Sequence, residues 1–365
     1  MAPAPFYLYA VHGGAGDHGL STERAVKDAL RAALVSLPPA PSTALDTTAA
    51  LIASLESSEP LNAGFGSNLT FTGRVECDAS LMDARSSAFG AVGALPGVTH
   101  PVQVARSVLE GRVKGRDSLG RVPPMVLVGE GARDFAQQRG LRVEDGERLI
   151  SERARREWEH WRRRLDRVEP LPGEELGTDI NALQDTVGGV VMDSAGDLAA
   201  GVSSGGLLLK ADGRAAVFGA GCYAQQISSS TSHRASASAI VGVAISISGE
   251  GELIIQSSLA KSIADALHSS PTGDAHEVLH DVLVEHFYNH WRLQGEPQPA
   301  AGVLLLVKEP GDGAARLWCA FTTPSMAIAY CSSVHPKPKV TILRNPSHSY
   351  EDDARPPIFI TALPL

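Results

Sequence analysis

Two Asp-Thr dipeptides occur in the chain, and one of them has neighbours that suit chemistry. Asp185 and Thr186 join a polar run to a glycine-containing apolar stretch, TVGGVVMD. A threonine hydroxyl is a weak nucleophile until a base removes its proton. If the chain is cut before Thr186, the new α-amine, with an ordinary pKa of about 8, can serve as that base. This raises the hypothesis of a self-cleaving threonine hydrolase; the alternative is a threonine that merely begins a strand.

The segments on either side of Thr186 favour the chemical interpretation. The segment from about residue 169 to residue 185 is rich in Pro, Gly and Glu, which is typical of a flexible linker. Such a linker can bend the carbonyl of Asp185 over the hydroxyl of Thr186. The strand that follows would hold the hydroxyl in place, and Gly188 and Gly189 would let neighbouring backbone approach it. Thr47, in the other Asp-Thr pair, falls inside a helical pattern, so we predict no chemical role for it.

The elements that must position Thr186 alternate between the strand period and the helix period. Ser21 or Thr22 is predicted to cap the first helix. The order of elements indicates sheets flanked by helices, in an α/β or α+β domain. The predicted strands are 6–16, 74–83, 87–95, 186–193, 198–204, 301–309, 315–323 and 325–332, and the predicted helices are 21–37, 44–58, 101–111, 129–139, 144–168, 249–270 and 274–291.

Composition limits the class of protein. A chain of 365 residues with 43% hydrophobic residues can form a full core, as one large domain or two. The net charge of −9 argues against a broad nucleic-acid-binding face. The four cysteines stand singly, without zinc-ligand spacing, and indicate reduced thiols in an intracellular protein. Neither a secretory signal nor a membrane-spanning run is visible, so we expect a nuclear or cytoplasmic protein that binds no membrane.

Two further segments have open interpretations. Segment 145–168 is dense in arginine, which is typical of a solvated, ion-paired helix, and its alternative is a nuclear-import or nucleic-acid patch. Segment 227–240 is polar and of low complexity, and it is predicted to be a lid or a mobile loop.

Several long motifs occur in an order that resembles the plant-type asparaginase family of N-terminal nucleophile hydrolases. They are VHGGAG, LNAGFGSNLTFTGRVECDASLMD, QDTVGGVVMD and LAAGVSSGGLLLKADGR, and the similarity runs from residue 7 to about residue 335. Within that family, VECDAS, FGAVGALPG, GRVPPMVLVGEGA and TTPSMAIAYCS resemble the threonine aspartase (taspase) branch. The resemblance implies an α+β fold, a four-layer αββα sandwich, made as an inactive precursor.

The resemblance also implies how the precursor matures. The cut would fall between Asp185 and Thr186, giving an α subunit, 1–185, and a β subunit, 186–365, that stay together as one folded unit. Thr186 would then be the nucleophile and its amine the base. The resemblance implies pairing of two αβ units and, in some branches, a structural sodium. The residues themselves predict no cofactor and no metal site.

Other site residues are carried over from the family motifs. Ser204 matches a hydroxyl that hydrogen-bonds the nucleophile, and Arg214 matches an arginine that binds the substrate carboxylate with its two-pronged guanidinium. Ser248 and Gly249 match the oxyanion pair, and Asn62 matches an asparagine that lines the same centre. Without the family, Ser204 would be interpreted as a strand-end serine and Arg214 as a surface arginine.

One departure bears on the substrate. Asparaginases place an acid shortly after the matching arginine, where it holds the substrate ammonium, but GRAAVFGAGC has none after Arg214 and is about three residues shorter. We therefore predict an endopeptidase that cleaves protein substrates after Asp, consistent with Asp185 at the self-cleavage site. The resemblance to the threonine aspartase branch implies that such substrates include transcription regulators. The alternatives are an L-asparaginase or isoaspartyl dipeptidase on the same scaffold, and an uncleaved, inactive scaffold protein.

Overall fold

The computed structural model describes residues 6–37, 42–166, 186–215, 220–226, 240–310, 315–346 and 356–365. Asp185 and the predicted linker 169–185 therefore lie outside the described residues, and so does the predicted insert 227–240 except for Ile240. Thr186 is the first described residue after that gap.

The larger sheet has eight strands in the order β12-β11-β1-β5-β6-β2-β3-β4. All neighbours pair antiparallel except β3 and β4. The strand that begins directly after Thr186, β5, is central and pairs with β1 on one side and β6 on the other. The strands are β1 (Leu8–Gly16), β2 (Glu76–Asp83), β3 (Ala88–Pro96), β4 (Val126–Val128), β5 (Val187–Met192), β6 (Leu198–Ser204), β11 (Ser325–Ser332) and β12 (Lys339–Arg344).

The smaller sheet has five antiparallel strands in the order β13-β10-β9-β8-β7. Two of its members, β9 and β10, agree with predicted strands, whereas β7, β8 and β13 were not predicted. The strands are β7 (Cys222–Gln226), β8 (Gly242–Gly249), β9 (Ala301–Lys308), β10 (Ala315–Phe321) and β13 (Phe359–Leu363).

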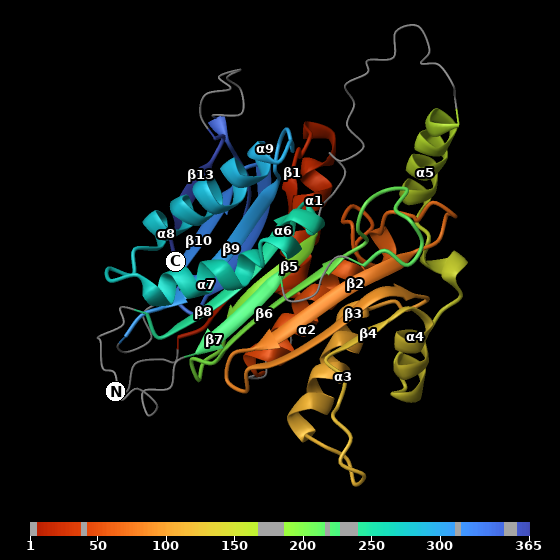
Figure 1. Ribbon diagram of the computed structural model, residues 1–365, viewed down its shortest axis with the longest axis horizontal. Helices are drawn as coiled ribbons and strands as arrows, with labels where there is room; N and C mark the ends of the chain where they lie inside the picture. Colours follow the sequence, from red (N-terminus) through yellow and green to blue (C-terminus); the bar gives the residue numbers. More distant parts are fainter. Residues whose placement is uncertain are drawn as a thin grey trace, which may run out of the picture.

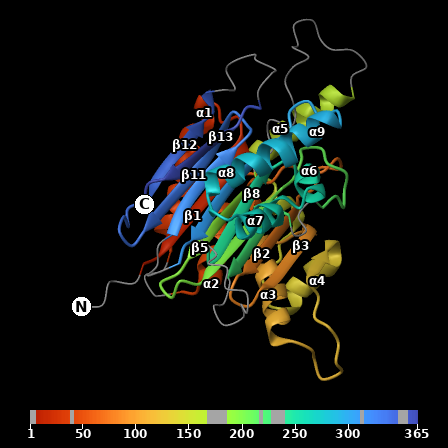
Figure 2. The ribbon, with the colours of Figure 1, turned by 60° about the vertical axis from the view of Figure 1, so that its left-hand side comes forward.

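Three apolar clusters show how the sheets and helices pack. One joins the first three helices to the larger sheet, a second contains residues of both sheets, and a third joins the smaller sheet to α7, α8 and η4. Figures 1 and 2 show helices α6 to α9 over the smaller sheet and α1 to α3 against the larger one. The protein is therefore a mixed α/β structure in which both sheets bury apolar side chains.

The helices follow the predicted segments with four local differences. The predicted helix 144–168 is a short 3-10 turn, Gly146–Leu149, followed by the helix Glu152–Leu165 that Ser151 caps. The segment 249–270 is two helices because Ser258 takes a left-handed backbone conformation (φ 45°) between them. The segment 274–291 contains a π-helical stretch. The predicted caps were wrong: the first helix begins earlier, at Leu20, with Gly19 as its N-cap. The helices are α1 (Leu20–Val35), α2 (Ala44–Glu56), η1 (Gly64–Gly66), α3 (Pro101–Lys114), α4 (Gly129–Gln138), η2 (Gly146–Leu149), α5 (Glu152–Leu165), α6 (Gly251–Gln256), α7 (Leu259–Ser269), α8 (Ala275–Asp281), η4 (Val282–Asn289) and α9 (His290–Leu293).

The arginine-dense segment forms α5, an ion-paired helix. Arg153 pairs with Glu157 at 2.8 Å and Arg163 with Glu159 at 3.1 Å, each one helical turn apart. This pairing confirms the first of the two interpretations of that segment. Among the helices of the described ranges, none combines the length and the apolar character that crossing a bilayer requires.

The sheets come very close together near the start of β5, at Gly188. A Cβ atom at this position would lie 2.2 Å from Ser246 Oγ of the smaller sheet and 2.6 Å from His12 Nε2 of β1. His12 is fully buried, and its Nε2 lies 2.7 Å from Ser246 Oγ. The absence of a side chain at Gly188 therefore lets the two sheets meet two residues beyond Thr186.

We expect Gly188→Ala to lower the free energy of unfolding by about 2 kcal/mol or more, because the new methyl group would overlap packed atoms. Urea unfolding monitored by circular dichroism measures this change. Gly111→Ala is the matched control, since a Cβ there meets nothing within 4 Å. Within α3 this control should be neutral or stabilising by up to about 1 kcal/mol. Equal effects of the two substitutions would contradict the close approach of the sheets.

A buried acid, Glu56, fastens α2 to β6 beside the site. Its Oε1 accepts hydrogen bonds from Ser203 Oγ at 2.6 Å and from Val102 N at 2.9 Å. Its Oε2 has no hydrogen-bond partner among the residues described. Burial raises the pKa of Glu56 to about 8, so the carboxyl group is protonated in the folded protein at neutral pH.

The raised pKa of Glu56 makes stability depend on pH. Between pH of about 4.5 and 8 the folded protein retains a proton that the unfolded chain loses, so the free energy of unfolding falls as the pH rises. Glu56→Gln removes this contribution, which amounts to at most about 1.4 kcal/mol per pH unit. Denaturant unfolding at several pH values should therefore show a weaker decline for the variant. A difference between the two proteins that is independent of pH would exclude a titrating Glu56.

Candidate active site

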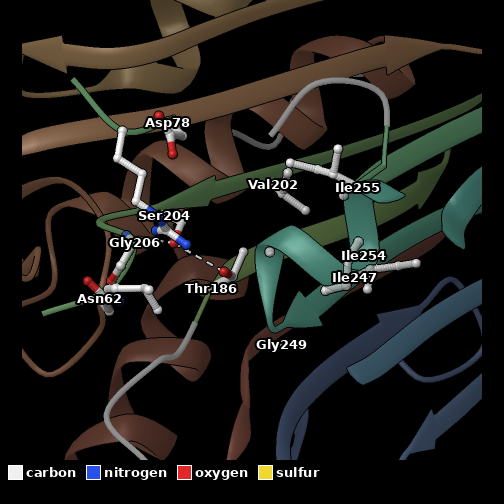
Figure 3. A pocket seen from close by; sticks show the side chains of 14 residues that line it. Asn62, Asp78, Thr186, Val202, Ser204, Gly206, Ile247, Gly249, Ile254 and Ile255 are labelled. Carbon is white, nitrogen blue, oxygen red and sulfur yellow. Dashed lines mark hydrogen bonds between the residues drawn. The ribbon is translucent and has the colours of Figure 1, made fainter. Parts of the chain in front are cut away.

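One pocket collects predicted site residues from separate segments of the chain. Thr186, Asn62, Ser204, Arg214 and Gly249 all line it. In Figure 3 the labelled polar residues lie on one side of Thr186 and the isoleucines of α6 on the other. Five of the residues selected from motifs thus meet in one cavity with a polar and an apolar wall, whereas Ser248 is not among its lining residues.

The hydroxyl of Thr186 is oriented by the neighbouring strand. Its Oγ1 donates a hydrogen bond to Ser204 Oγ at 3.1 Å, drawn as the dashed line in Figure 3. Because Val187 pairs with Ser203 in the β5–β6 ladder, the preceding residue lies naturally opposite Ser204. Gly206 N donates to the same Ser204 oxygen at 3.0 Å. Ser204 is therefore itself held in place while it accepts from the hydroxyl.

Ser248 reaches Thr186 from the smaller sheet. Its Oγ accepts hydrogen bonds from Thr186 N at 3.3 Å and from Ala15 N at 3.0 Å. These two donors leave the Ser248 hydroxyl hydrogen without an acceptor among the residues that the structure describes. Ser248 is 1% exposed and is not among the residues that line the pocket, whereas the next residue, Gly249, does line it. A hydroxyl with a free hydrogen beside the pocket is compatible with the predicted role of oxyanion donor.

Gly249 follows Ser248 at the end of β8, in a conformation that only glycine adopts readily (φ 134°). A Cβ atom here would lie 2.2 Å from the carbonyl oxygen of Ala300. The glycine therefore allows the backbone that carries Ser248 to pass close to β9 and to line the pocket.

Asn62 lines the pocket, and both ends of its amide hold neighbouring backbone. Its Nδ2 donates to Gly206 O at 2.9 Å, and its Oδ1 accepts from Asn68 N at 2.8 Å. The same Gly206 that donates to Ser204 is thus fixed by Asn62. The geometry supports a positioning role for Asn62 more directly than contact with a substrate.

Arg214 is presented by the segment that follows β6. Gly213 N donates to Glu76 Oε2 at 2.7 Å, and the buried Lys210 donates through Nζ to Gly205 O at 2.9 Å. The first bond fastens the segment to β2 of the larger sheet, and the second closes the segment on itself. The guanidinium of Arg214 forms an ion pair with Glu252 of α6.

Sequence reasoning missed two residues of this region. Glu252 stands in the run SGEGE, three residues after Gly249, and its acidic side chain was the available signal. His12 lies in VHGGAG, but its bond to Ser246 depends on contact between the sheets and cannot be predicted from local pattern. Burial lowers the pKa of His12 to about 3, so this imidazole is neutral at neutral pH.

The second Asp-Thr pair, Asp46 and Thr47, lies within helix α2. Thr47 is buried in α2, and its amide donates to Thr43 O at 2.9 Å. An amide held in a helix cannot rearrange for cleavage, which agrees with the prediction that Thr47 has no chemical role.

A family model and the similar proteins all point to the same family. A family model described as asparaginase (Asparaginase_2) matches residues 6–287. A plant-type L-asparaginase of Pyrococcus abyssi is 31% identical over 290 residues, covering 76% of this chain and 85% of the relative. An isoaspartyl peptidase/L-asparaginase of Mus musculus is 30% identical over 329 residues, covering 88% and 87%. A plant-type L-asparaginase of Pyrobaculum calidifontis is 34% identical over 284 residues, covering 72% and 80%.

These relatives change the balance between the predicted activities. Their names describe amidases and isopeptidases, so the comparisons support the alternative prediction, asparaginase or isoaspartyl peptidase, better than the prediction of an endopeptidase. The threonine aspartase branch stays a prediction. The broader expectation of a hydrolase is supported by the family as a whole. With the family model spanning most of its length, the chain belongs to the asparaginase family (Asparaginase_2) of N-terminal nucleophile hydrolases.

Proposed function

We propose that the protein is a self-processing threonine hydrolase that cleaves an amide bond of an aspartyl group. The observation that carries this proposal is the convergence on Thr186 of two hydroxyl groups from different sheets. Ser204 accepts from its Oγ1, and Ser248 accepts from its backbone N. A guanidinium in the same pocket, that of Arg214, is suited to a carboxylate.

Self-processing would cut the chain between residues 185 and 186 and leave both products in one fold. The α subunit 1–185 would keep β1 and β2, and the β subunit 186–365 would begin with β5. Because β1 pairs with β5 and β2 with β6, main-chain hydrogen bonds would hold the subunits together after the cut. The three apolar clusters support the proposal of a four-layer αββα sandwich.

The chemistry follows from the groups around Thr186. The α-amine freed by the cut takes the hydroxyl proton, and Oγ1 attacks the substrate carbonyl. The Ser248 hydroxyl and the Gly249 N–H donate to the developing oxyanion. The proton then passes to the leaving amine as the C–N bond breaks, and an ester remains on Thr186. Water, activated by the same amine, hydrolyses that ester and restores the enzyme.

An aspartyl group has two carbonyl carbons, one in the main chain and one in the side chain. The pocket can bind the carboxylate at one of them while the amide bond at the other is cleaved. If Arg214 binds the α-carboxylate, the side-chain amide bond lies before Thr186, which is asparaginase or isoaspartyl peptidase chemistry. The names of the relatives favour this assignment. We therefore propose L-asparagine and β-aspartyl peptides as the first substrate class.

In a second candidate function, the bound carboxylate and the cleaved carbonyl exchange positions on the aspartyl group. If Arg214 binds the side-chain carboxylate, the protein is an endopeptidase that cleaves after Asp. The observation in its favour is the lack of any acid in residues 215–220, directly after the arginine. The acid before it, Asp212, is bound to Thr70 Oγ1 at 2.8 Å and to Arg74 at 3.1 Å. Neither flank of Arg214 therefore supplies an obvious partner for a substrate ammonium.

A three-substrate assay on the self-cleaved protein tests the proposal. We expect hydrolysis of L-asparagine, measured as ammonia, and of β-aspartyl-leucine, measured as free leucine. An internal Asp peptide, followed by mass spectrometry, should be cut slowly or not at all. Arg214→Ala should lower kcat/KM by about a hundredfold or more, because two charge-assisted hydrogen bonds are lost.

Arg31→Ala is the control, since Arg31 is a half-exposed residue of α1 that pairs with Asp28. It should leave all three rates unchanged. Cleavage of the internal Asp peptide alone would establish the second candidate in place of the first. Inactivity of the cleaved protein towards every one of the three substrates would remove the aspartyl assignment.

A further inference from the structure

The ion pair between Arg214 and Glu252 joins two separate parts of the pocket. Arg214 comes from the segment after β6, and Glu252 comes from the first turn of α6. The arginine side chain is 18% exposed and the glutamate side chain 46% exposed. Arg214 lines the pocket, whereas Glu252, between the lining residues Gly251 and Ile254, is nearly half exposed to solvent.

The first substrate class places two opposite charges on one carbon. L-asparagine and a β-aspartyl peptide each carry an α-carboxylate and an α-ammonium group. A guanidinium has five N–H donors, so Arg214 can keep its bond to Glu252 and still bind the substrate carboxylate with other donors. A substrate ammonium next to that carboxylate then lies near the carboxylate of Glu252.

Other acids near the pocket are less suited to an ammonium group. Asp78 lines the pocket, but it is 2% exposed and its Oδ1 accepts from Ala94 N at 2.8 Å. Asp212 is turned towards Thr70 and Arg74. Glu252 is the acid that contacts Arg214 directly while remaining accessible to a ligand.

We propose that Glu252 binds the α-ammonium group of the substrate while Arg214 binds its α-carboxylate. This assignment rests on the proposed function and names its substrate class: an aspartyl group with a free amino terminus. Glu252 takes the place of the acid that is absent after Arg214, from a different element of the fold. An Asp inside a chain has a neutral amide nitrogen at this position, so it would bind without the charge pairing.

The position of Glu252 also links recognition to chemistry. It stands three residues after Gly249, and the segment between them connects β8 directly to α6. Glu250 N in that segment donates to Ala300 O at 2.8 Å, which fixes the connection to β9. A substrate held by its ammonium group at Glu252 is thus placed relative to the oxyanion donors by a short, anchored stretch of backbone.

Product binding tests this assignment independently of turnover. L-aspartate and succinate differ only in the ammonium group, and isothermal titration calorimetry of the self-cleaved protein measures both affinities. We expect wild type to bind L-aspartate at least about tenfold more tightly than succinate. Glu252→Gln, which keeps the size of the side chain, should remove this preference, whereas Glu252→Asp should retain part of it. The control is Glu277→Gln, which removes an exposed acid from the first turn of α8 and should leave the preference intact.

The same comparison extends to catalysis with L-asparagine and succinamic acid, its analogue without the amine. Glu252→Gln should lower kcat/KM for asparagine by about tenfold or more and leave that for succinamic acid within about twofold. Equal losses for both substrates would show that Glu252 only positions Arg214, and would overturn the assignment. An unchanged aspartate preference in Glu252→Gln would overturn it as well. Inactive wild type that still prefers aspartate would refute the proposed reaction while supporting the ammonium site.

Discussion

The site depends on one structural constraint: Thr186 stands at the start of a central strand, at a place where the second sheet comes into direct contact. β5 is paired on both sides, so the residue before it has little freedom. Ser204 reaches Thr186 from the adjacent strand and Ser248 from the opposite sheet. Gly188 permits that contact, since any side chain there would meet Ser246 and His12. A hydroxyl held in this way can approach a carbonyl carbon from few directions, which suits the nucleophile role proposed for Thr186.

Burial divides the titratable groups near the pocket into two sets. His12 and Glu56 are buried, and burial shifts the pKa of each towards its neutral form. Arg214, which lines the pocket, forms an ion pair with the more exposed Glu252. This division leaves an arginine and an acid as the charged groups that a small zwitterionic substrate would meet first. This arrangement is the basis of the proposal that an aspartyl group is bound without an acid directly after Arg214.

Local patterns in the sequence predicted much of this structure, and the exceptions have physical reasons. The strands around Thr186 and Ser204 were predictable because their apolar runs and glycines are local signals. The break at Ser258 was not, since the helical periodicity continues through a residue whose φ turns positive. The predicted cap failed because Gly19 satisfies the first turn through its backbone, with no side-chain signal. Motif order selected Thr186, Ser204 and Arg214, but Glu252 reaches its partner only through the packing of α6, which no spacing rule reveals.

Intact mass spectrometry of the purified protein, beside Thr186→Ala, tests the central claim most directly. The account predicts that wild type separates under denaturing conditions into two polypeptides, whose masses place the cut between residues 185 and 186. The alanine variant, which lacks the attacking oxygen, should remain one full-length chain. A wild-type chain that stays intact after long incubation, or an alanine variant cut at the same bond, would contradict the assignment of Thr186 as the nucleophile.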